Sequence, residues 1–230
     1  MRRFVLFDLD DTLIDRQRAL RTWIADFGAK LRLGAGLSAQ AGADVEAWLG
    51  ETFAAGARPW HFQTLRERLA LAESADQLWR RYYLDLAERV HCPPAVLAGL
   101  DELRDRGWAV GVLTNGPVDA QQVKLRRTGI VEHVDAWCIS GELGVHKPDA
   151  AVFAEAIRRC GIPEDGVGWM VGDNPVADIG GGRAAGLRTI WISGGRPWPG
   201  PGPDADLTVP DAAAAIRVLL TLDGDASARR

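Results

Sequence analysis

The sequence predicts an α/β protein built on a parallel β-sheet, with an all-helical segment inserted after the first strand. Three observations predict this fold. Residues 4–7 are apolar without alternation, which is typical of a strand buried on both faces. Residues 15–92 show no strand pattern and repeat apolar residues at helical spacing. From residue 95 onward helical and strand patterns alternate, which indicates βαβ units.

Length and composition exclude several classes of protein. A chain of 230 residues is long enough for one large domain, or for a core with a smaller insert. Its net charge of −4 gives no basic footprint for nucleic acid. No apolar stretch approaches the length of a membrane span, and the charged start does not resemble a signal peptide. We therefore expect a cytoplasmic protein, a monomer or homodimer, with neither nucleic acid nor membrane as a partner.

The cysteines fit the same expectation. Cys92, Cys138 and Cys160 are odd in number and lack the spacing of metal or redox motifs. Reduced, buried thiols are the simplest interpretation.

The first strand leads into the predicted helical insert, residues 15–92. Ser38 and Ser74 are plausible N-caps for two of about four helices. The expected helices span 16–33, 38–49, 62–71 and 74–90. Cys92-Pro93-Pro94 closes the insert, because two prolines disfavour helix continuation.

One segment of the insert is a candidate for substrate specificity: Arg58, Trp60 and His61. An arginine can bind an anion and a tryptophan can stack on a ring. The alternative for His61 is a residue at a helix start or on the surface. The other insert aromatics fall at helical spacing and are expected to form its core.

The expected core comprises residues 1–14 and 93–222, followed by a flexible tail over 223–230. Asp149 is a plausible N-cap within this part. The periodicity predicts helices over 95–106, 118–128, 150–160, 176–185 and 211–221. It predicts the later strands over 108–113, 134–139, 167–171, 187–192 and 206–209.

Asp8 and Asp10 follow the first strand directly. Residues two apart in extended chain point to the same side, so both carboxylates can approach one point. Two close carboxylates repel unless a cation or a shared proton relieves them. The pair therefore indicates a divalent metal site, an acid/base pair, or both. Asp11 points the other way and is assigned to the turn.

Three more polar clusters follow later strands, and each has a simpler structural alternative. Thr114 and Asn115 could hold phosphoryl oxygens, or form an ordinary turn. Lys147 is one of only three lysines and could neutralise phosphate, or be a solvated loop residue. Asp173 and Asp178 could bind a metal, or cap a helix and compensate its dipole.

Taken together, DxDxT, TN, KP and GDxxxxD occur in this order, each at a strand end. This set resembles the four signature motifs of the haloacid dehalogenase superfamily of hydrolases. The resemblance also covers residues 122–125, 140–144 and 178–186. It implies a Rossmann-like parallel-sheet core with a helical cap inserted after the first motif. Ala150 departs from the proline common in relatives, without touching a motif residue.

The resemblance also implies roles for these residues. Asp8 would be the nucleophile that forms an aspartyl-phosphate, and Asp10 would be the general acid and base. Asp8, the backbone carbonyl of Asp10 and Asp173 would bind Mg²⁺. The phosphoryl group would be held by Thr114, Asn115 and Lys147. Asp178 would orient a metal-bound water or pair with Lys147.

Asp10 also selects among the chemistries of this superfamily. Its dehalogenases have a non-acidic residue at this position and use no metal, so Asp10 favours a phosphatase of small phosphorylated metabolites. The implied substrates are sugar phosphates, phosphoglycolate and nucleoside monophosphates. A phosphomutase shares all four motifs and is an alternative. A non-catalytic binding protein is a third, although no motif carboxylate is missing.

Overall fold

The computed structural model describes residues 3–35, 38–54, 56–162, 167–199 and 205–227. The chain forms two compact units. The core unit comprises Met1–Ile14 and His91–Arg230, and the helical unit comprises Asp15–Val90. His91 and Cys92, which the predicted boundary placed in the insert, fall in the core unit.

A six-stranded parallel sheet organises the core unit. Its strands are β1 (Arg3–Phe7), β2 (Ala109–Thr114), β3 (Ala136–Ile139), β4 (Val167–Gly172), β5 (Arg188–Ile192) and β6 (Leu207–Val209). The order β3-β2-β1-β4-β5-β6 is the Rossmann order, which confirms the predicted fold class. The order reverses at β1, with β2 on one side and β4 on the other. In such sheets, ligands bind beyond the carboxyl ends of the strands at this reversal.

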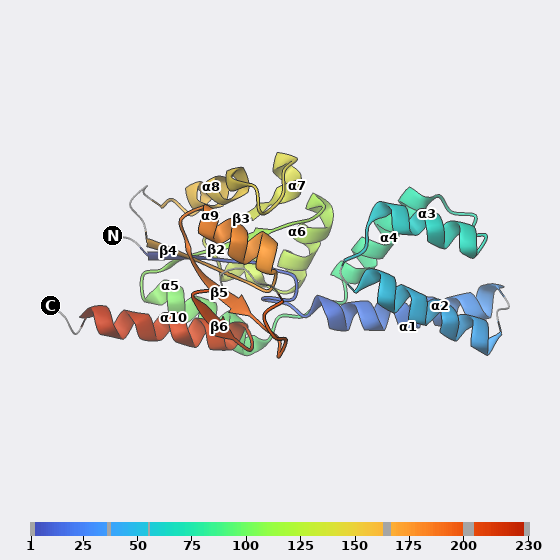
Figure 1. The fold of residues 1–230 in the computed structure, drawn as a ribbon, viewed down its shortest axis with the longest axis horizontal. Helices are drawn as coiled ribbons and strands as arrows, with labels where there is room; N and C mark the ends of the chain where they lie inside the picture. The colour runs from blue at the N-terminus through green and yellow to red at the C-terminus, as the bar shows by residue number, and fades with distance from the viewer. Residues whose placement is uncertain (1–2, 36–37, 55, 163–166, 200–204, 228–230) are drawn as a thin grey trace. The chain divides into compact units, whose positions relative to one another are not determined.

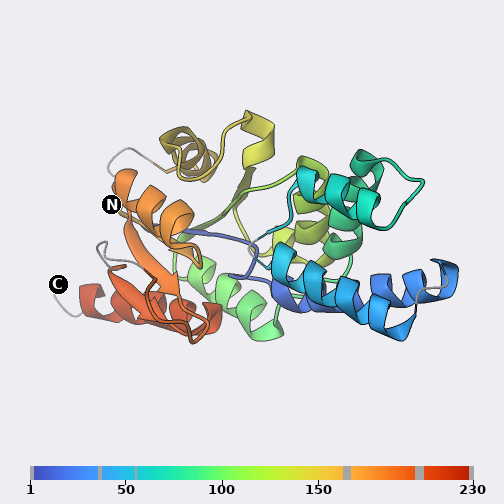
Figure 2. The same ribbon diagram turned by 45° about the vertical axis from the view of Figure 1, so that its right-hand side comes forward.

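Helices cover both faces of the sheet, so its strands are buried on both sides (Figures 1 and 2). The core helices are α5 (Pro94–Asp105), α6 (Val118–Arg127), α7 (Ser140–Leu143), α8 (Ala150–Arg159), α9 (Gly181–Ala184) and α10 (Ala212–Ser227). Helix α8 packs its Phe153 with Leu6, Leu113 and Met170 in one apolar cluster. Helices α5 and α10 lie together on the opposite face (Figure 1). This burial explains the unbroken apolar runs of the strands.

Two of the predicted core helices differ from the observed ones by more than one residue at an end. The helix expected over 176–185 is divided into η2 (Pro175–Gly180), a wider π-helical turn, and α9. The Asn174 side chain accepts from the backbone N–H groups of Val176 and Ala177, at 3.0 and 2.9 Å. Asn174 therefore caps this turn in place of Asp173. Ile179 N–H reaches back five residues to the Asn174 carbonyl, which gives the π turn.

The last helix is longer than predicted. Helix α10 continues to Ser227, so residues 223–227 of the expected tail are helical, while 228–230 lie outside the described residues. This segment contains Gly224, but one glycine lowers helix propensity by only about 1 kcal/mol and leaves the hydrogen bonding intact.

The helical unit contains α1 (Arg16–Ala35), α2 (Ala39–Phe53), α3 (Pro59–Arg68) and α4 (Ala75–Ala87). The predicted N-caps are present, with Ser38 accepting from Ala41 N–H and Ser74 from Gln77 N–H, each at 3.2 Å. Aromatic rings in contact form the core of this unit: Trp23, Phe27, Phe53, Phe62 and Tyr82. The unit thus has an apolar core of its own.

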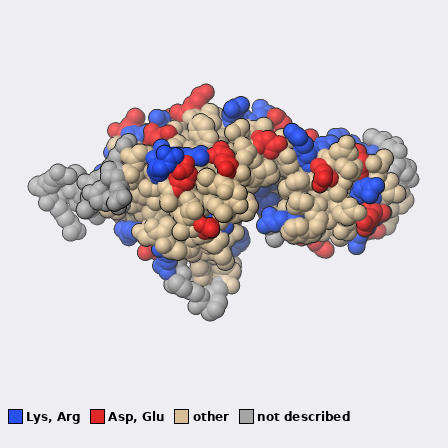
Figure 3. Space-filling view, turned by 90° about the horizontal axis from the view of Figure 1, so that it is seen from above, with Lys and Arg blue, Asp and Glu red and all other residues tan. Residues whose placement is uncertain are grey.

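Charges of both signs are interspersed on the face drawn in Figure 3. No helix among the described residues is long and apolar enough to cross a membrane.

Candidate active site

Asp8 lies directly after β1, at the carboxyl edge of the sheet. Its backbone N–H donates to the Val171 carbonyl of β4 at 2.8 Å, so strand pairing extends to this residue and fixes its place. The residue is only 7% exposed. A carboxylate this buried needs a cation or hydrogen-bond donors to remain ionised.

Lys147 provides that cation. Its ammonium lies 2.6 Å from Asp8 Oδ1, 2.7 Å from Asp178 Oδ1 and 2.8 Å from the Leu113 carbonyl oxygen. An ammonium has three N–H donors, and these contacts use all three. Lys147 is therefore a buried bridge between the end of β1 and η2, rather than a solvated loop residue.

Asn115 holds the backbone that carries Lys147. Asn115 Nδ2 donates to the Lys147 carbonyl at 3.1 Å, and Lys147 N–H donates to Asn115 Oδ1 at 2.9 Å. The peptide bond between Lys147 and Pro148 is cis. The reciprocal pair joins the loop after β2 to the loop before α8, and it engages the amide that was predicted to bind phosphate.

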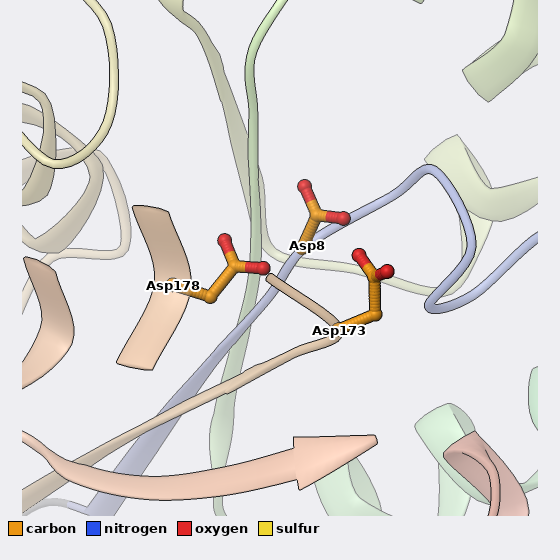
Figure 4. Close-up of side chains that lie close together, drawn as sticks. All are labelled: Asp8, Asp173 and Asp178. Atoms are coloured by element: carbon orange, nitrogen blue, oxygen red, sulfur yellow. The ribbon is translucent and has the colours of Figure 1, made fainter. Parts of the chain in front are cut away.

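Three carboxylates lie close together at this edge of the sheet (Figure 4). One oxygen each of Asp8, Asp173 and Asp178 lie within 4.8 Å of one another. Gly172, at the end of β4, makes this approach feasible, because a Cβ there would overlap the Asp178 carboxylate. Asn174 N–H donates to Asp178 Oδ2 at 2.9 Å and holds that side chain in place. The cluster presents hard oxygen donors of the kind that Mg²⁺ prefers.

The electrostatics of the cluster follow from its burial and from its excess of negative charge. Burial raises the pKa of Asp8 to about 8, with Asp178 and Asp173 adding to the rise and Lys147 opposing it. Burial likewise raises the pKa of Asp173 to about 6, together with the charges of Asp178 and Asp11. Burial disfavours the Lys147 ammonium, but the Asp178 and Asp8 carboxylates outweigh it and raise the lysine pKa. One ammonium thus faces three carboxylates, and a bound cation would relieve the remaining repulsion.

Asp10 has different side-chain partners, two of which lie on α6. Lys124 Nζ lies 2.8 Å from its Oδ1 and 2.7 Å from its Oδ2. Gln121 Nε2 donates to Asp10 Oδ2 at 3.1 Å and to Thr114 Oγ1 at 2.5 Å. Thr114, predicted to bind phosphate, is therefore linked to Asp10 through Gln121. The two aspartates of the first motif pair with different lysines.

Asp11 occupies the turn to which the sequence assigned it. Its φ of 59° is left-handed, which aspartate tolerates better than most residues. Its backbone N–H donates to the Ile14 carbonyl at 2.8 Å and closes the turn.

Asp173 is held by β5 and by the loop that follows it. Arg196 Nη2 lies 3.2 Å from Asp173 Oδ2, and Trp191 Nε1 donates to the Asp173 carbonyl at 2.9 Å. The side chain and the backbone carbonyl of Asp173 are thus both held by contacts within the protein.

Most predicted site residues lie together in the core unit, whereas three lie in the helical unit. Arg58 precedes α3, and its backbone N–H donates to His61 Nδ1 at 3.1 Å. His61 also stacks on Phe53, with ring centroids 5.7 Å apart. Trp60 is 65% exposed. His61 thus occupies a helix start, which was the alternative interpretation of this residue.

Three residues of the site were not predicted as such: Gln121, Lys124 and Arg196. For Lys124 a signal was present, because it is one of three lysines in an arginine-rich chain. Gln121 lies about one helical turn before Lys124, on the same face of α6. This spacing indicates a role for Gln121 only when Lys124 is known to be part of the site. Arg196 comes from an irregular loop and carries no comparable signal.

Similarity to known proteins identifies the family of this chain. Residues 3–186 match the haloacid dehalogenase-like hydrolases. The chain belongs to this family, and the predicted resemblance is confirmed. It is accordingly an enzyme of the hydrolase class, as predicted.

Two relatives and one solved structure are similar to this chain over most of its length. A phosphoserine phosphatase of Thermus thermophilus is 33% identical, with 91% of this chain and 96% of the relative covered. A pyrimidine 5'-nucleotidase of Streptococcus pneumoniae, PynA, is 28% identical over 83% of this chain and 84% of its own. Among solved structures, a HAD phosphatase from Thermococcus onnurineus shares the fold, with a TM-score of 0.67 and 24% identity, covering 94% of this chain and 97% of its own.

Proposed function

We propose that this protein is a Mg²⁺-dependent phosphatase that hydrolyses a small phosphomonoester through an aspartyl-phosphate on Asp8. The observation that carries the proposal is the buried Lys147, which bridges Asp8 and Asp178 beside Asp173. A nucleophilic carboxylate and a lysine at one buried point suit the transfer of an anionic phosphoryl group.

The residues present fit a magnesium ion. Three carboxylates offer oxygens within 4.8 Å of one another, and one ammonium leaves their charge partly uncompensated. Asp8, Asp173 and the backbone carbonyl of Asp10 would hold the ion, while Asp178 keeps its bond to Lys147. When bound, Mg²⁺ neutralises charge on the phosphoryl oxygens.

The chain's own residues then divide the reaction into two displacements. In the first, an Asp8 carboxylate oxygen attacks phosphorus, the bond to the leaving oxygen breaks, and Asp10 gives that oxygen a proton. In the second, water attacks the aspartyl-phosphate, Asp10 takes the proton from the water, and the bond between Asp8 and phosphorus breaks. Inorganic phosphate leaves, and both aspartates return to their starting state. Lys147, with the Thr114 hydroxyl, stabilises the phosphoryl oxygens.

The substrate class rests on the relatives. Their names specify phosphoserine and pyrimidine nucleotides, both of which carry a phosphomonoester on a small polar body. We infer a substrate of this kind, with Arg58, Trp60 and His61 as the proposed contacts for the part beyond phosphate.

The test is phosphate release from a panel of phosphorylated metabolites with Mg²⁺, using wild type, Asp8→Asn and Asp211→Asn. Asp211 makes the same chemical change at an N-cap, where its Oδ1 accepts from Ala214 N–H at 2.8 Å and asparagine caps equally well. We expect Asp8→Asn to abolish turnover and Asp211→Asn to retain it. Wild-type-like release by Asp8→Asn would contradict the proposed nucleophile.

The same panel separates the phosphomutase alternative. A phosphatase releases inorganic phosphate from the ester alone. Turnover that requires a bisphosphate activator, and that yields an isomeric ester, would favour the mutase.

A further inference from the structure

A second lysine is buried in the core unit, and its partner is Asp10. The Lys124 side chain is 6% exposed, and its ammonium lies within 2.8 Å of both Asp10 carboxylate oxygens. A lysine in such a position is held in one geometry, because leaving a buried charge without its partner is strongly unfavourable. The ion pair therefore fixes the Asp10 carboxylate as well.

Gln121 adds a second fixed donor from the same helix. Its Nε2 reaches Asp10 Oδ2 at 3.1 Å, and Gln121 itself is 1% exposed. Residues three apart on a helix lie on one face, so Gln121 and Lys124 approach Asp10 from the same side. Gly116 (φ 149°) packs against Gln121, since a Cβ there would lie 3.1 Å from the Gln121 side chain.

Lys124 and Gln121 both act as hydrogen-bond donors to Asp10, and this limits the interactions they can make with it. Lysine ammonium and the glutamine Nε2 group donate hydrogen bonds and accept none. When Asp10 carries a proton, neither partner can receive it. In the proposed reaction, the acceptor of the Asp10 proton is the leaving oxygen.

We propose that Lys124 and Gln121 are positioning residues, which orient Asp10 so that its proton is delivered to the leaving group. The inference rests on the proposed function, in which Asp10 is the acid. It assigns a function to two α6 residues that touch neither the nucleophile nor Lys147 among the described contacts.

The test compares two substrates that differ in their need for a proton. An alkyl phosphate releases an alkoxide, which must be protonated, whereas p-nitrophenyl phosphate releases a stable phenolate. The quantity compared is kcat/KM, because it reports the first displacement. For Lys124→Met we expect a loss of about 10²-fold with the alkyl ester, at the lower end of general acid catalysis. With the aryl ester the expected loss is about threefold or less.

Two further variants separate positioning from a general structural role. Lys124→Arg keeps a donor cation and should restore most of the alkyl activity. In an Asp10→Asn background, Lys124→Met should have no further effect on kcat/KM, because the two changes remove one and the same function. Lys30→Met, which removes an exposed lysine of α1, is the matched control and should leave both activities unchanged.

Circular dichroism verifies the folding of each variant. If Lys124→Met does not fold, Lys124→Gln decides, because it removes the charge but keeps a hydrogen-bond donor, and it should show the same selective loss at smaller size. Equal losses with both esters, or additive effects of Lys124→Met and Asp10→Asn, would overturn the inference. Failure of the wild type to release phosphate from either ester would instead overturn the proposed function, and this inference with it.

Discussion

Lys147 and Asp8 form a buried ion pair, with Nζ 2.6 Å from Oδ1 and the lysine side chain only 2% exposed. The residues are far apart in sequence, and the pair joins the first strand to the loop before α8. It is the central contact of the site, because the same ammonium also binds Asp178.

Replacing Lys147 by methionine should destabilise the protein, because the ammonium compensates part of the negative charge of the cluster. The change leaves three converging carboxylates without a cation, and breaking a buried pair destabilises by about 3–5 kcal/mol. Urea unfolding in EDTA measures this loss, and millimolar Mg²⁺ should restore part of it. A free energy of unfolding within about 1 kcal/mol of wild type in EDTA would contradict the prediction.

Gly172→Ala should disturb the site through steric overlap alone. The added methyl group would occupy the space of the Asp178 carboxylate. We expect about 1–3 kcal/mol of destabilisation, typical of overpacking, together with reduced phosphate release. Gly50→Ala is the matched control: nothing lies within 4 Å of its added Cβ, and alanine favours the α2 helix by up to about 1 kcal/mol. Equal stability of the two variants would count against the close approach of Asp178 to β4.

The stability of the metal-free protein should depend on pH through Asp173. The pKa of Asp173 in the folded state is about 6, above its ordinary value of 3.8, so the folded state binds this proton more tightly. The stabilisation that comes from this tighter proton binding is fully present below pH 3.8 and is lost as the pH rises through 6. Asp173→Asn has no such proton. As the pH rises from 3.8 to 6, its free energy of unfolding should therefore increase relative to that of wild type by up to about 3 kcal/mol. Urea titrations in EDTA across this range measure the difference, and a constant difference would refute it.

Arg196 should weaken the binding of Mg²⁺. Its guanidinium lies 3.2 Å from Asp173 Oδ2, so its positive charge opposes a cation bound at the same carboxylate. Arg196→Gln should tighten the Kd for Mg²⁺ about tenfold, measured by isothermal titration calorimetry. Arg217→Gln removes the same charge from an exposed position on α10 and should leave the Kd unchanged. Weaker binding by Arg196→Gln would show that orientation of Asp173 outweighs repulsion.

The fold and the place of the site could be predicted from sequence because both depend on local rules. Apolar runs define strands, and parallel strands bring their carboxyl ends to one edge. Asp8, Thr114 and Asp173 each follow such a run, so their proximity follows from topology alone. The strand order around β1 then determines which loops meet.

The partners of individual side chains could not be predicted in this way. Asp8 and Asp10 share one motif, yet each pairs with a different lysine, because the approach of Lys124 depends on how α6 packs. The η2 turn likewise depends on a side-chain cap by Asn174, which competes with ordinary helix geometry. Arg196 reaches Asp173 from an irregular loop, where periodicity gives no information.

The central position of β1 has a consequence for how this chain acquires its structure. The middle strand is synthesised first, but its neighbours begin only at Ala109 and Val167. The whole helical unit emerges from the ribosome in between, and its contacts are local. Local contacts form faster than distant ones. The helical unit should therefore complete its folding while β1 still awaits β2 and β4, so the surroundings of Asp8 are completed only afterwards.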